Sequence, residues 1–504
     1  MAQNIRRPTS LRIGTKMKHY DVIIIGAGPG GIFAAYELVK NNAQARIACF
    51  EKGAELANRR CPIDGKKIKS CIHCPVCSIM SGFGGAGAFS DGKYNITNEF
   101  GGNLYEYIGR DEATELMKYV DEINMSHGGE GTRLYSTADT AIKKKCFEHD
   151  LKLLGAQVRH LGTDKNYVVL QNLYDEMKEK VDFYFRSNVD KVYDVSNMPE
   201  NLPPVTDSKA RYVIEVEAPG SEGSPEEHAA EFFSAEELII SIGRSGSKWM
   251  ETVCDDLGLE KKSNRVDIGI RVELPHEVFS ELTDELYESK IVYRTKQYND
   301  LVRTFCMNPH GVVVNENTNG IVTVNGHSYE DPAMHTENTN FALLVTKHFT
   351  EPFKESNDYG ESIARLSNML GGGVIVQRFG DLISGRRTNE SRLEGSFVRP
   401  TLAATPGDLS LVIPKRIMDD IIEMVYALDK IAPGTANQDT LLYGVEVKFY
   451  NMEVKMGKDL DTGHPGLYVI GDGSGVTHSL SHASASGVFV ARRILKAHGI
   501  GQDN

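Results

Sequence analysis

Three glycines and one acidic residue near the start of the chain have the spacing of a site for phosphate and ribose. Gly26, Gly28 and Gly31 follow the pattern G-x-G-x-x-G, and Glu51 lies 20 residues after Gly31. The first glycine permits a tight turn, the second lets a pyrophosphate approach the backbone, and the third lets a helix pack on a strand. The carboxylate can accept hydrogen bonds from both ribose hydroxyls. Because it would repel the 2′-phosphate of NADP, we expect FAD or NAD.

The residues around these glycines predict the elements that position them. Residues 22–25 are β-branched, which is typical of a buried parallel strand. Residues 32–40 predict a helix, and residues 46–50 predict a second strand. The helix N-terminus then directs N–H groups and the positive end of its dipole at the phosphates. The predicted cofactor-binding residues of this βαβ unit also include Pro29, Gly30 and Lys52.

A second turn, near the C-terminus, narrows the choice of dinucleotide. A predicted strand ends in Gly471-Asp472-Gly473, and a helix rich in small residues follows. In such a turn the Asp472 carboxylate can accept a hydrogen bond from a ribityl hydroxyl. The helix dipole can face the flavin edge on which reduction builds negative charge. A cofactor that is both a dinucleotide and a ribityl compound is FAD. A simple turn before a C-terminal helix is the alternative.

Residues 82–93, GFGGAGAFSDGK, contain five glycines and two alanines. Such a segment has little side-chain bulk, as the container of a flat ring or a pyrophosphate requires. A flexible hinge is the alternative, but Phe83 and Phe89 stand where a linker would carry serine. The predicted cofactor site therefore includes the following residues of this segment and of the turn at 243–244: Gly84, Gly85, Ala86, Ser90, Asp91, Gly243 and Arg244.

Four cysteines, Cys61, Cys71, Cys74 and Cys77, crowd into the loop that precedes this segment, with His73 among them. Their thiolates can surround one zinc ion or iron–sulfur cluster, and we take the four as candidate metal ligands. Redox-active thiols facing a flavin, and reduced cysteines packed beside a cofactor, remain open alternatives. The wide first spacing matches neither a zinc ribbon nor a common ferredoxin pattern.

The composition limits the class of protein. A chain of 504 residues is too long for one core and predicts two or three lobes. A net charge of −13 argues against a surface that binds nucleic acid generally. No apolar run approaches the roughly 18 residues of a membrane helix, and the N-terminus has no apolar core like that of a signal peptide. We therefore expect a cytoplasmic protein with no membrane partner.

The predicted fold class is α/β (α+β overall): a Rossmann-like FAD-binding domain with an inserted mixed α/β substrate domain. Residues 181–217 alternate like the strands of a small antiparallel unit, residues 413–430 predict one amphipathic helix, and residues 441–454 predict a strand pair. The predicted divisions are a flexible arm (1–19), the FAD domain with the cysteine loop (20–110), a helical segment (111–180), the small β unit with the return to the FAD domain (181–263), the substrate domain (264–430), and the second part of the FAD domain (431–504).

These segments together resemble the uncharacterised FAD-dependent dehydrogenases, flavoproteins of the two-dinucleotide-binding-domain superfamily. The resemblance covers residues 20–495 and rests on IIIGAGPGGIFAAYEL, the cysteine loop with SGFGGAGAFSDGKYN, IISIGRSG, VDIGIRVE, RTFCMNPHG and LYVIGDGSGVTHSLSHASASGVFVAR. It implies an FAD-binding domain assembled from N- and C-terminal segments, with the substrate domain between them. The family more often has a basic residue at position 478 and glutamine at 482, so no substrate preference carries over.

The leading hypothesis is an FAD-dependent dehydrogenase that moves a hydride between flavin N5 and a small organic substrate. The substrate is acidic if Arg303, Arg386 and Arg387 hold it, although solvated surface arginines are the alternative. No second complete G-x-G-x-x-G stands in a βαβ setting. NAD(P)H would therefore bind only transiently, or the organic substrate itself donates the hydride.

His478, His482 and Cys306 are the candidate catalytic residues. A histidine near its ordinary pKa can donate or accept a proton, and two histidines four residues apart share one face of a helix. Capping or core histidines are the alternative.

Two other functions stay open: a flavoenzyme that modifies nucleic acid or another macromolecule through the basic loop 59–69, and a redox sensor or electron carrier that uses the cysteine cluster. The sequence predicts no oligomeric state.

Overall fold

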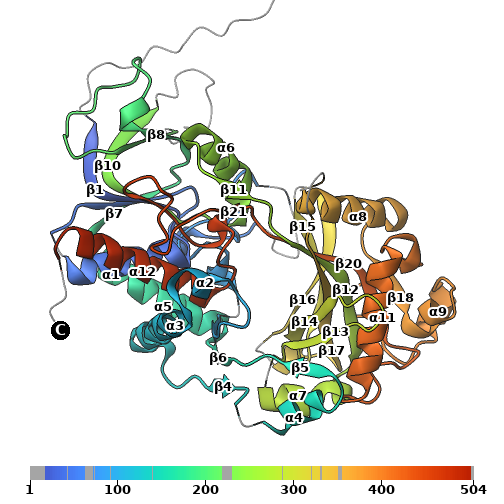
Figure 1. Cartoon of the computed structure of the whole chain (residues 1–504). Coiled ribbons are helices and arrows are strands. Elements are labelled where there is room, and N and C mark those ends of the chain that lie inside the picture. The colour runs from blue at the N-terminus through green and yellow to red at the C-terminus, as the bar shows by residue number, and fades with distance from the viewer. Residues whose placement is uncertain are drawn as a thin grey trace, which may run out of the picture. The chain divides into compact units, whose positions relative to one another are not determined.

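The structure, a computed structural model, divides into two compact units (Figure 1). Unit 1 comprises residues 1–134, 158–262 and 451–504, and unit 2 comprises residues 135–157 and 263–450. The residues that the structure describes are 17–42, 44–62, 72, 74–90, 92–138, 140–217, 230–286, 288–318, 320–329, 332–349, 353 and 355–500. The predicted arm therefore lies outside the described residues up to residue 16. No helix within these ranges is long and apolar enough to span a membrane.

A parallel sheet forms the centre of unit 1. Its strands run in the order β7 (Val181–Phe185), β2 (Ile47–Glu51), β1 (Lys18–Ile25) and β10 (Glu231–Ile240), and β22 (Leu467–Val469) pairs with the end of β10. Alternate residues of β1 supply two cores, because successive side chains of a strand point to opposite faces. Val22 and Ile24 pack with α1 (Pro29–Asn41) and α12 (Leu480–Ala497). Ile23 packs with α6 (Ser247–Leu257) on the other face.

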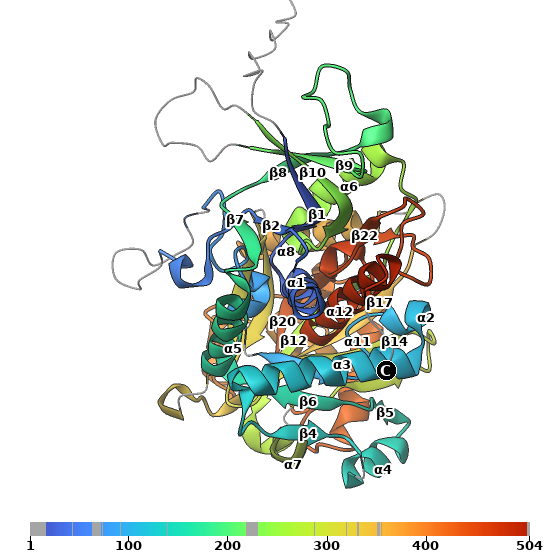
Figure 2. The ribbon, with the colours of Figure 1, turned by 90° about the vertical axis from the view of Figure 1, so that its left-hand side faces the viewer.

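Burial on both faces explains why the strands of unit 1 are near-continuous apolar runs. Figures 1 and 2 both show α1 and α12 lying side by side, although more than 400 residues of sequence separate them. Unit 1 is thus assembled from the N-terminal and C-terminal segments, and the predicted α/β fold class is confirmed.

The predicted antiparallel unit at 181–217 is partly wrong. β7 pairs in parallel with β2 and extends the central sheet. The antiparallel part contains only β8 (Val189–Asp194), β9 (Tyr212–Val216) and the first half of β10. β10 is long enough to pair with two strands in succession: residues 231–235 with β9, and residues 238–240 with β22. Residue alternation does not show whether a neighbouring strand is parallel, which is why the assignment failed.

The predicted helical segment at 111–180 contains helices and strands. Its helices are α3 (Arg110–Asn124), α4 (Ala141–Phe147) and α5 (Gly162–Met177), preceded by α2 (Leu104–Ile108). Its strands are β4 (Leu134–Ser136), β5 (Leu151–Leu153) and β6 (Gln157–His160), and β6 also pairs with β3 (Lys93–Ile96). β5 joins the large sheet of unit 2 by pairing with β13. This distant pairing overrides the local helical pattern.

Unit 2 is built on an eight-stranded sheet. Its order is β19 (Thr405–Pro406), β18 (Ile375–Arg378), β20 (Leu441–Phe449), β12 (Val266–Pro275), β17 (Asn338–Lys347), β14 (Leu301–Asn308), β13 (Ile291–Arg294) and β5. One face packs Ile268 and Ile270 of β12 against α7 (His276–Leu286) and α11 (Lys415–Asp429). The remaining elements include α8 (Ser356–Gly371), α9 (Phe379–Ile383), α10 (Glu390–Glu394) and the hairpin of β15 (Val312–Thr318) and β16 (Ile321–His327).

The amphipathic helix predicted at 413–430 is confirmed as α11. The strand pair predicted at 441–454 is wrong, although both strands exist. β20 pairs with β12 and β18, whereas β21 (Glu453–Val454) pairs with β11 (Lys261–Lys262) of unit 1. Unit 2 therefore extends to Tyr450, beyond the predicted division at 430.

Candidate functional site

The glycine turn follows β1 as the spacing predicted. Helix α1 begins at Pro29, and Gly28 is its N-cap. A Cβ on Gly26 would lie 2.3 Å from the Ser241 carbonyl oxygen, and one on Gly31 would lie 2.1 Å from the Gly26 carbonyl oxygen. Gly26 also has a φ of +101°, which disfavours any side chain. Packing between β1, α1 and the end of β10 thus requires both glycines.

Gly28 is a glycine for a different reason. A Cβ there would meet only the Ser241 carbonyl oxygen, at 4.0 Å, which is ordinary contact. A Cβ on Gly243 would meet nothing within 4 Å. The packing of the protein does not require a glycine at either place, so the space beside them is available to a ligand. Since both residues follow neighbouring parallel strands, this edge of the sheet fits a dinucleotide whose pyrophosphate lies against the N-terminus of α1.

Glu51, at the end of β2, joins three backbone segments. Its carboxylate accepts hydrogen bonds from the N–H groups of Ala27 (3.0 Å), Gly53 (2.8 Å) and Gly82 (2.9 Å). The residue is 7% exposed. A carboxylate has about four lone-pair positions, and these three hydrogen bonds leave about one for the predicted contact with ribose. The sequence did not indicate that Glu51 also holds the backbone together.

The glycine-rich segment lies against the turn of the βαβ unit. The Gly84 N–H donates to the Ala27 carbonyl (2.8 Å), and a Cβ on Gly85 would lie 3.3 Å from the Gly28 Cα. The Ser90 hydroxyl donates to Gly87 O of its own loop (2.7 Å). Ala86 is exposed, and Lys52 Nζ donates to Ser245 Oγ (3.0 Å). Asp91 lies outside the described residues.

Two residues, Phe83 and Arg59, anchor this segment through contacts that the sequence did not indicate. Phe83 is fully buried, and its ring contacts Tyr174 (centroids 5.0 Å apart). Arg59 donates to three carbonyls, of Ser78 (2.9 Å), Ile79 (2.7 Å) and Phe83 (2.6 Å). Burial lowers the pKa of Arg59 to about 10, so the side chain stays charged at neutral pH. Because Arg59 is 4% exposed, it is not available as a contact for nucleic acid.

The cysteines do not gather where the structure describes them. Cys61 and Cys77 are exposed and Cys74 is half-buried, while Cys71 and His73 lie outside the described residues. Within the described residues, one set of three side chains could place a ligand atom each within 4.8 Å of one another: Glu236, Glu237 and His498. Arg211 approaches both of these carboxylates and Lys209 approaches Glu236, so protein cations already face this set. The metal-ligand role of the four cysteines stays a prediction.

The C-terminal turn carries an ion pair that the sequence did not indicate. Arg244 Nε donates to Asp472 Oδ2 (2.7 Å), and His478 Nδ1 lies 3.1 Å from Asp472 Oδ1. Burial alone would raise the pKa of the Asp472 carboxyl, but the charge of Arg244 and the contact with His478 outweigh it and lower the pKa to about 2. The carboxylate is therefore ionised at neutral pH, and it joins the ends of β10 and β22. Gly471 and Gly473 flank it, with Gly471 at a φ of +70°.

The prediction that the two candidate histidines share one face of a helix is wrong. Helix α12 begins at Leu480, so His478 lies in the loop before it. His482 is fully buried, and its Nδ1 lies 2.8 Å from Ser479 Oγ. Burial, with repulsion from His478, lowers the pKa of His482 to about 4. His482 is therefore neutral at physiological pH, whereas His478 faces an ionised carboxylate, to which its Nδ1 must donate.

Cys306, the third catalytic candidate, lies in unit 2 where β14 bulges. The register with β17 shifts between Phe305 and Asn308, and Cys306 has a φ of +43°. Its carbonyl accepts a hydrogen bond from Arg271 Nη1 (3.1 Å). Arg271 is fully buried and forms two hydrogen bonds with Glu446, at 2.8 and 3.0 Å. The backbone around Cys306 is thus held by a buried ion pair that the sequence did not predict.

Cationic side chains surround Phe305 on this polar face of the unit 2 sheet. Lys290 Nζ lies 4.1 Å from the ring centroid, Arg303 Cζ 5.4 Å and Lys448 Nζ 5.9 Å. Of the three arginines predicted to hold an acidic substrate, only Arg303 takes part. Arg386 donates to Asp381 (2.7 Å) and is half exposed, and Arg387 is exposed. Lys290 and Lys448 were missed because no motif connects them with Phe305.

Comparison with known families matches each unit to a flavoprotein model. Residues 20–194 match the model of the pyridine nucleotide-disulphide oxidoreductases. Residues 266–449 match the model described as FAD-dependent protein, C-terminal domain-like. The second match coincides with the large sheet of unit 2, from the first residue of β12 to the last of β20.

Individual relatives are distant. An uncharacterized protein of Clostridium beijerinckii is 24% identical over 517 residues, which cover 98% of this chain and 84% of the relative. Glycine oxidase from Geobacillus kaustophilus is 12% identical with a TM-score of 0.37, over 95% of each chain. E. coli quinol fumarate reductase is 12% identical with a TM-score of 0.38, over 97% of this chain and 70% of that one. Likeness at this level says nothing about the substrate.

Proposed function

Since the chain is an FAD-dependent oxidoreductase, we propose that it moves a hydride between flavin N5 and a small organic acid. Bound FAD would supply the hydride chemistry, which no amino-acid side chain can perform. In unit 1, the open space beside Gly28 would receive the pyrophosphate, and the remaining lone pair of Glu51 would face the ribose. Asp472, ionised at neutral pH, would accept from a ribityl hydroxyl.

The proposal that the substrate is acidic rests on the three cations around the half-buried ring of Phe305. Each cation already has a carboxylate partner: Glu288 for Lys290, Asp267 for Arg303, and both Glu446 and Glu316 for Lys448. Arg303 Nε is nevertheless buried without a hydrogen-bond partner among the described residues, and Lys448 has three N–H donors for its two carboxylates. An aromatic surface with cationic donors at its rim favours a flat or short organic anion over a neutral molecule.

His478 is the side chain that we propose for proton transfer in the reaction. Asp472 orients its ring through Nδ1. His482 would instead support the loop through Ser479 and carry no charge. A general acid or base contributes about 10²–10⁴-fold to a rate. The His478→Asn variant should therefore lose that much in kcat and lose the pH dependence of kcat, whereas His482→Asn should keep the wild-type pH profile.

The proposal is tested by mixing the FAD-loaded protein, without oxygen, with a panel of small organic acids and their amides. At least one acid should bleach the visible absorption of the flavin, and its amide should be about tenfold or more weaker in kcat/KM. Lys290→Met should raise KM for that acid with FAD content unchanged, and the exposed Lys296→Met is the matched control. Equal rates with acids and amides, or equal effects of the two variants, would contradict the acidic substrate.

The other two functions have less support. Arg59, the first residue of the basic loop proposed for nucleic acid, is committed to backbone carbonyls. The described cysteines are not grouped as an electron relay through one metal centre would require. A transient encounter with NAD(P)H remains compatible with the proposal, and it predicts that NADH or NADPH reduces the bound flavin in the same anaerobic assay.

A further inference from the structure

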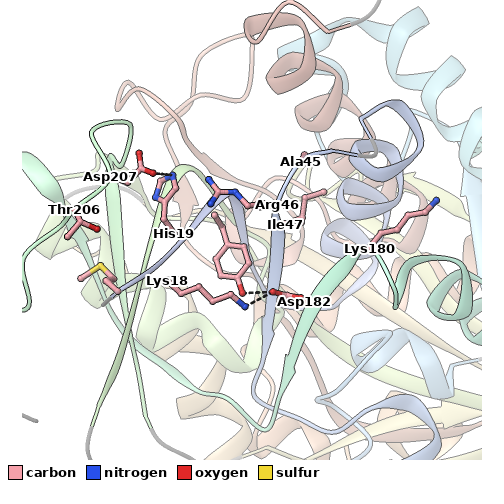
Figure 3. A pocket seen from close by; sticks show the side chains of 11 residues that line it. Lys18, His19, Ala45, Arg46, Ile47, Lys180, Asp182, Thr206 and Asp207 are labelled. Atoms are coloured by element: carbon pink, nitrogen blue, oxygen red, sulfur yellow. Dashed lines mark hydrogen bonds and ion pairs between the residues drawn. The ribbon is translucent and has the colours of Figure 1, made fainter. Parts of the chain in front are cut away.

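A groove of about 700 Å³ lies at the edge of the unit 1 sheet where β1, β2 and β7 begin (Figure 3). The cofactor turn lies at the other edge, where β1 and β2 end. β1 runs over 8 residues from Lys18 to Ile25. At about 3.3 Å per residue, Lys18 lies about 23 Å from the turn, and Ile47, which pairs with Val22, lies about 10 Å from it. A molecule in the groove therefore cannot contact a dinucleotide bound beside Gly28, and the groove needs a role of its own.

His19 is a buried polar side chain of this groove without a complete set of partners. The residue is 9% exposed, and its Nδ1 lies 3.0 Å from Ser234 Oγ. Its Nε2 has no hydrogen-bond partner among the described residues. Figure 3 shows it facing Asp207, but Nε2 lies 3.7 Å from Asp207 Oδ2, which is too far for a hydrogen bond. Burial lowers the pKa of His19, so the ring is neutral at physiological pH.

The charged residues of the groove offer more donors than acceptors. Lys180 is exposed and has no acidic partner in the described part of the chain. The Arg46 guanidinium uses one of its five N–H donors on Asp21 Oδ1 (3.2 Å). Asp182, in contrast, already accepts from Lys18 (2.7 Å) and from the Tyr20 hydroxyl (2.6 Å). Asp207, the second carboxylate of the lining, accepts a hydrogen bond from the Lys209 N–H (3.0 Å). Three cations thus face two carboxylates, so the lining has an excess of positive charge that would suit a ligand with acceptors and negative charge.

The rest of the lining fits the organic part of such a ligand. Tyr20, Ala45 and Ile47 line the groove beside the charged groups. A volume of about 700 Å³ lies within the range of small-molecule sites. We propose that this groove binds a small organic oxyanion, a carboxylate or a phosphate ester, as an effector that is separate from FAD and from the substrate. Because the ligand would join the starts of three strands, binding should stabilise unit 1 against unfolding.

Calorimetric titration of the FAD-loaded full-length protein tests this inference. The probes are malonate, which carries only carboxylates, and phosphoglycolate, which also carries a phosphate, each against sodium chloride at matched ionic strength. We expect saturable binding of at least one probe beyond the chloride signal, with a rise in the unfolding temperature. Similar affinities would identify a carboxylate site, and much tighter binding of phosphoglycolate would identify a phosphate site. No saturable binding of either probe would overturn the proposal.

Variants of exposed cations separate a site from general charge attraction. Arg46→Gln and Lys180→Gln should each weaken binding about tenfold or more. Lys178→Gln, which removes the same charge two residues from Lys180 and outside the groove, should leave binding unchanged. An equal loss in Lys178→Gln would overturn the proposal. FAD content and flavin reduction should not change in any of the three variants, so this test is independent of the proposed dehydrogenase activity.

Discussion

In β1 and β2 of unit 1 the residues that lead to the cofactor turn are apolar, and the buried charge of Glu51 comes where β2 ends. In unit 2, charged side chains lie within the strands. β1 ends in four β-branched residues before its glycine turn, and Glu51 is the last residue of β2. β12 instead alternates apolar residues with Asp267, Arg271 and Glu273, and all three are fully buried. β2 and β12 thus both bury charge, but at different places along the strand.

The difference lies in what stabilises each charge. At a strand end, backbone N–H groups of neighbouring turns are not used by the sheet and can donate hydrogen bonds to a side chain. Three such N–H groups donate to Glu51. Within a strand, the backbone is already paired with its neighbours, so other side chains must supply the partners. Arg271 therefore needs Glu446 and Asn340, which come from two adjacent strands. The Arg271 guanidinium is thus stabilised by other side chains, whereas the Glu51 carboxylate is stabilised by backbone N–H groups.

Removing one member of the unit 2 network should have the largest effect. Arg271→Leu removes two hydrogen bonds from the buried Glu446 carboxylate and leaves Lys448 as its remaining cation, and we expect a loss of about 3–5 kcal/mol in the free energy of unfolding. Arg365→Leu, which removes an exposed partner of Glu361, should cost less than about 0.5 kcal/mol. Urea unfolding followed by circular dichroism measures both. The double variant Arg271→Leu/Glu446→Leu should recover most of the loss, and a single variant as stable as the control would contradict the comparison.

The nucleotide end of the protein could be predicted because its signals are local. Gly26, Gly28 and Gly31 stand within six residues, and the geometry of a turn after a strand fixes their roles. Asp472 is likewise identified by the glycines on both sides. The sequence did not indicate that Glu51 holds Gly82, because that contact spans 31 residues. Local patterns thus identified the residues, and the tertiary contacts decided how they share their hydrogen bonds.

The polar face of unit 2 could not be predicted because its burial is not local. The alternation in β12 is that of a strand with one solvent-exposed face. The hairpin of β15 and β16 covers that face instead. A Cβ on Gly326 of β16 would lie 2.3 Å from Arg271 Nη1, so the hairpin backbone approaches the guanidinium directly. Which face of β12 is exposed to water therefore depends on a segment about 50 residues later in the chain.

At the strand-end carboxylate of unit 1, Glu51→Gln should have the second largest effect. Glutamine has one acceptor oxygen in place of two, and its NH₂ group would oppose at least one of the three backbone donors. Leaving a buried N–H unsatisfied costs about 1–3 kcal/mol, and we expect a loss of that size in the free energy of unfolding. FAD content after gel filtration should fall as well. Glu179→Gln, at an exposed position, is the control, and full retention of FAD and stability in Glu51→Gln would contradict the role assigned to Glu51.

Asp472 and its partners predict a pH dependence of unit 1. Its folded-state pKa of about 2 lies below the ordinary value of about 3.9, so its contribution to stability is present above pH 4 and is lost as the pH falls through 2. A quarter of the side chain is exposed, and we therefore expect only about 1–2 kcal/mol. Unfolding measured between pH 7 and pH 2 should show the loss in the wild type and not in Asp472→Asn. Arg244→Gln should move the loss to higher pH, and identical profiles of all three proteins would exclude the ion pair as its cause.

Glu273, within β12, should give stability a pH dependence opposite in sign to that of Asp472, and its effect should be the smallest of the four. Burial raises its pKa, although Thr401, Tyr443 and Asn338 donate hydrogen bonds to it. The folded state then keeps the proton to a higher pH than the unfolded state, so stability falls as the pH rises from the ordinary pKa of about 4.3 through the folded-state value.

Glu273→Gln cannot ionise, and the hydroxyls of Thr401 and Tyr443 can rotate to serve an amide. We therefore expect its free energy of unfolding at neutral pH to lie within about 1 kcal/mol of the wild type, with a weaker fall in unfolding temperature between pH 5 and pH 8. A steeper fall in the variant would mean that the Glu273 carboxylate is stabilised within the strand as well as Asp472 is at a strand end. The contrast between the two sheets would then rest on position alone and not on how each sheet stabilises charge.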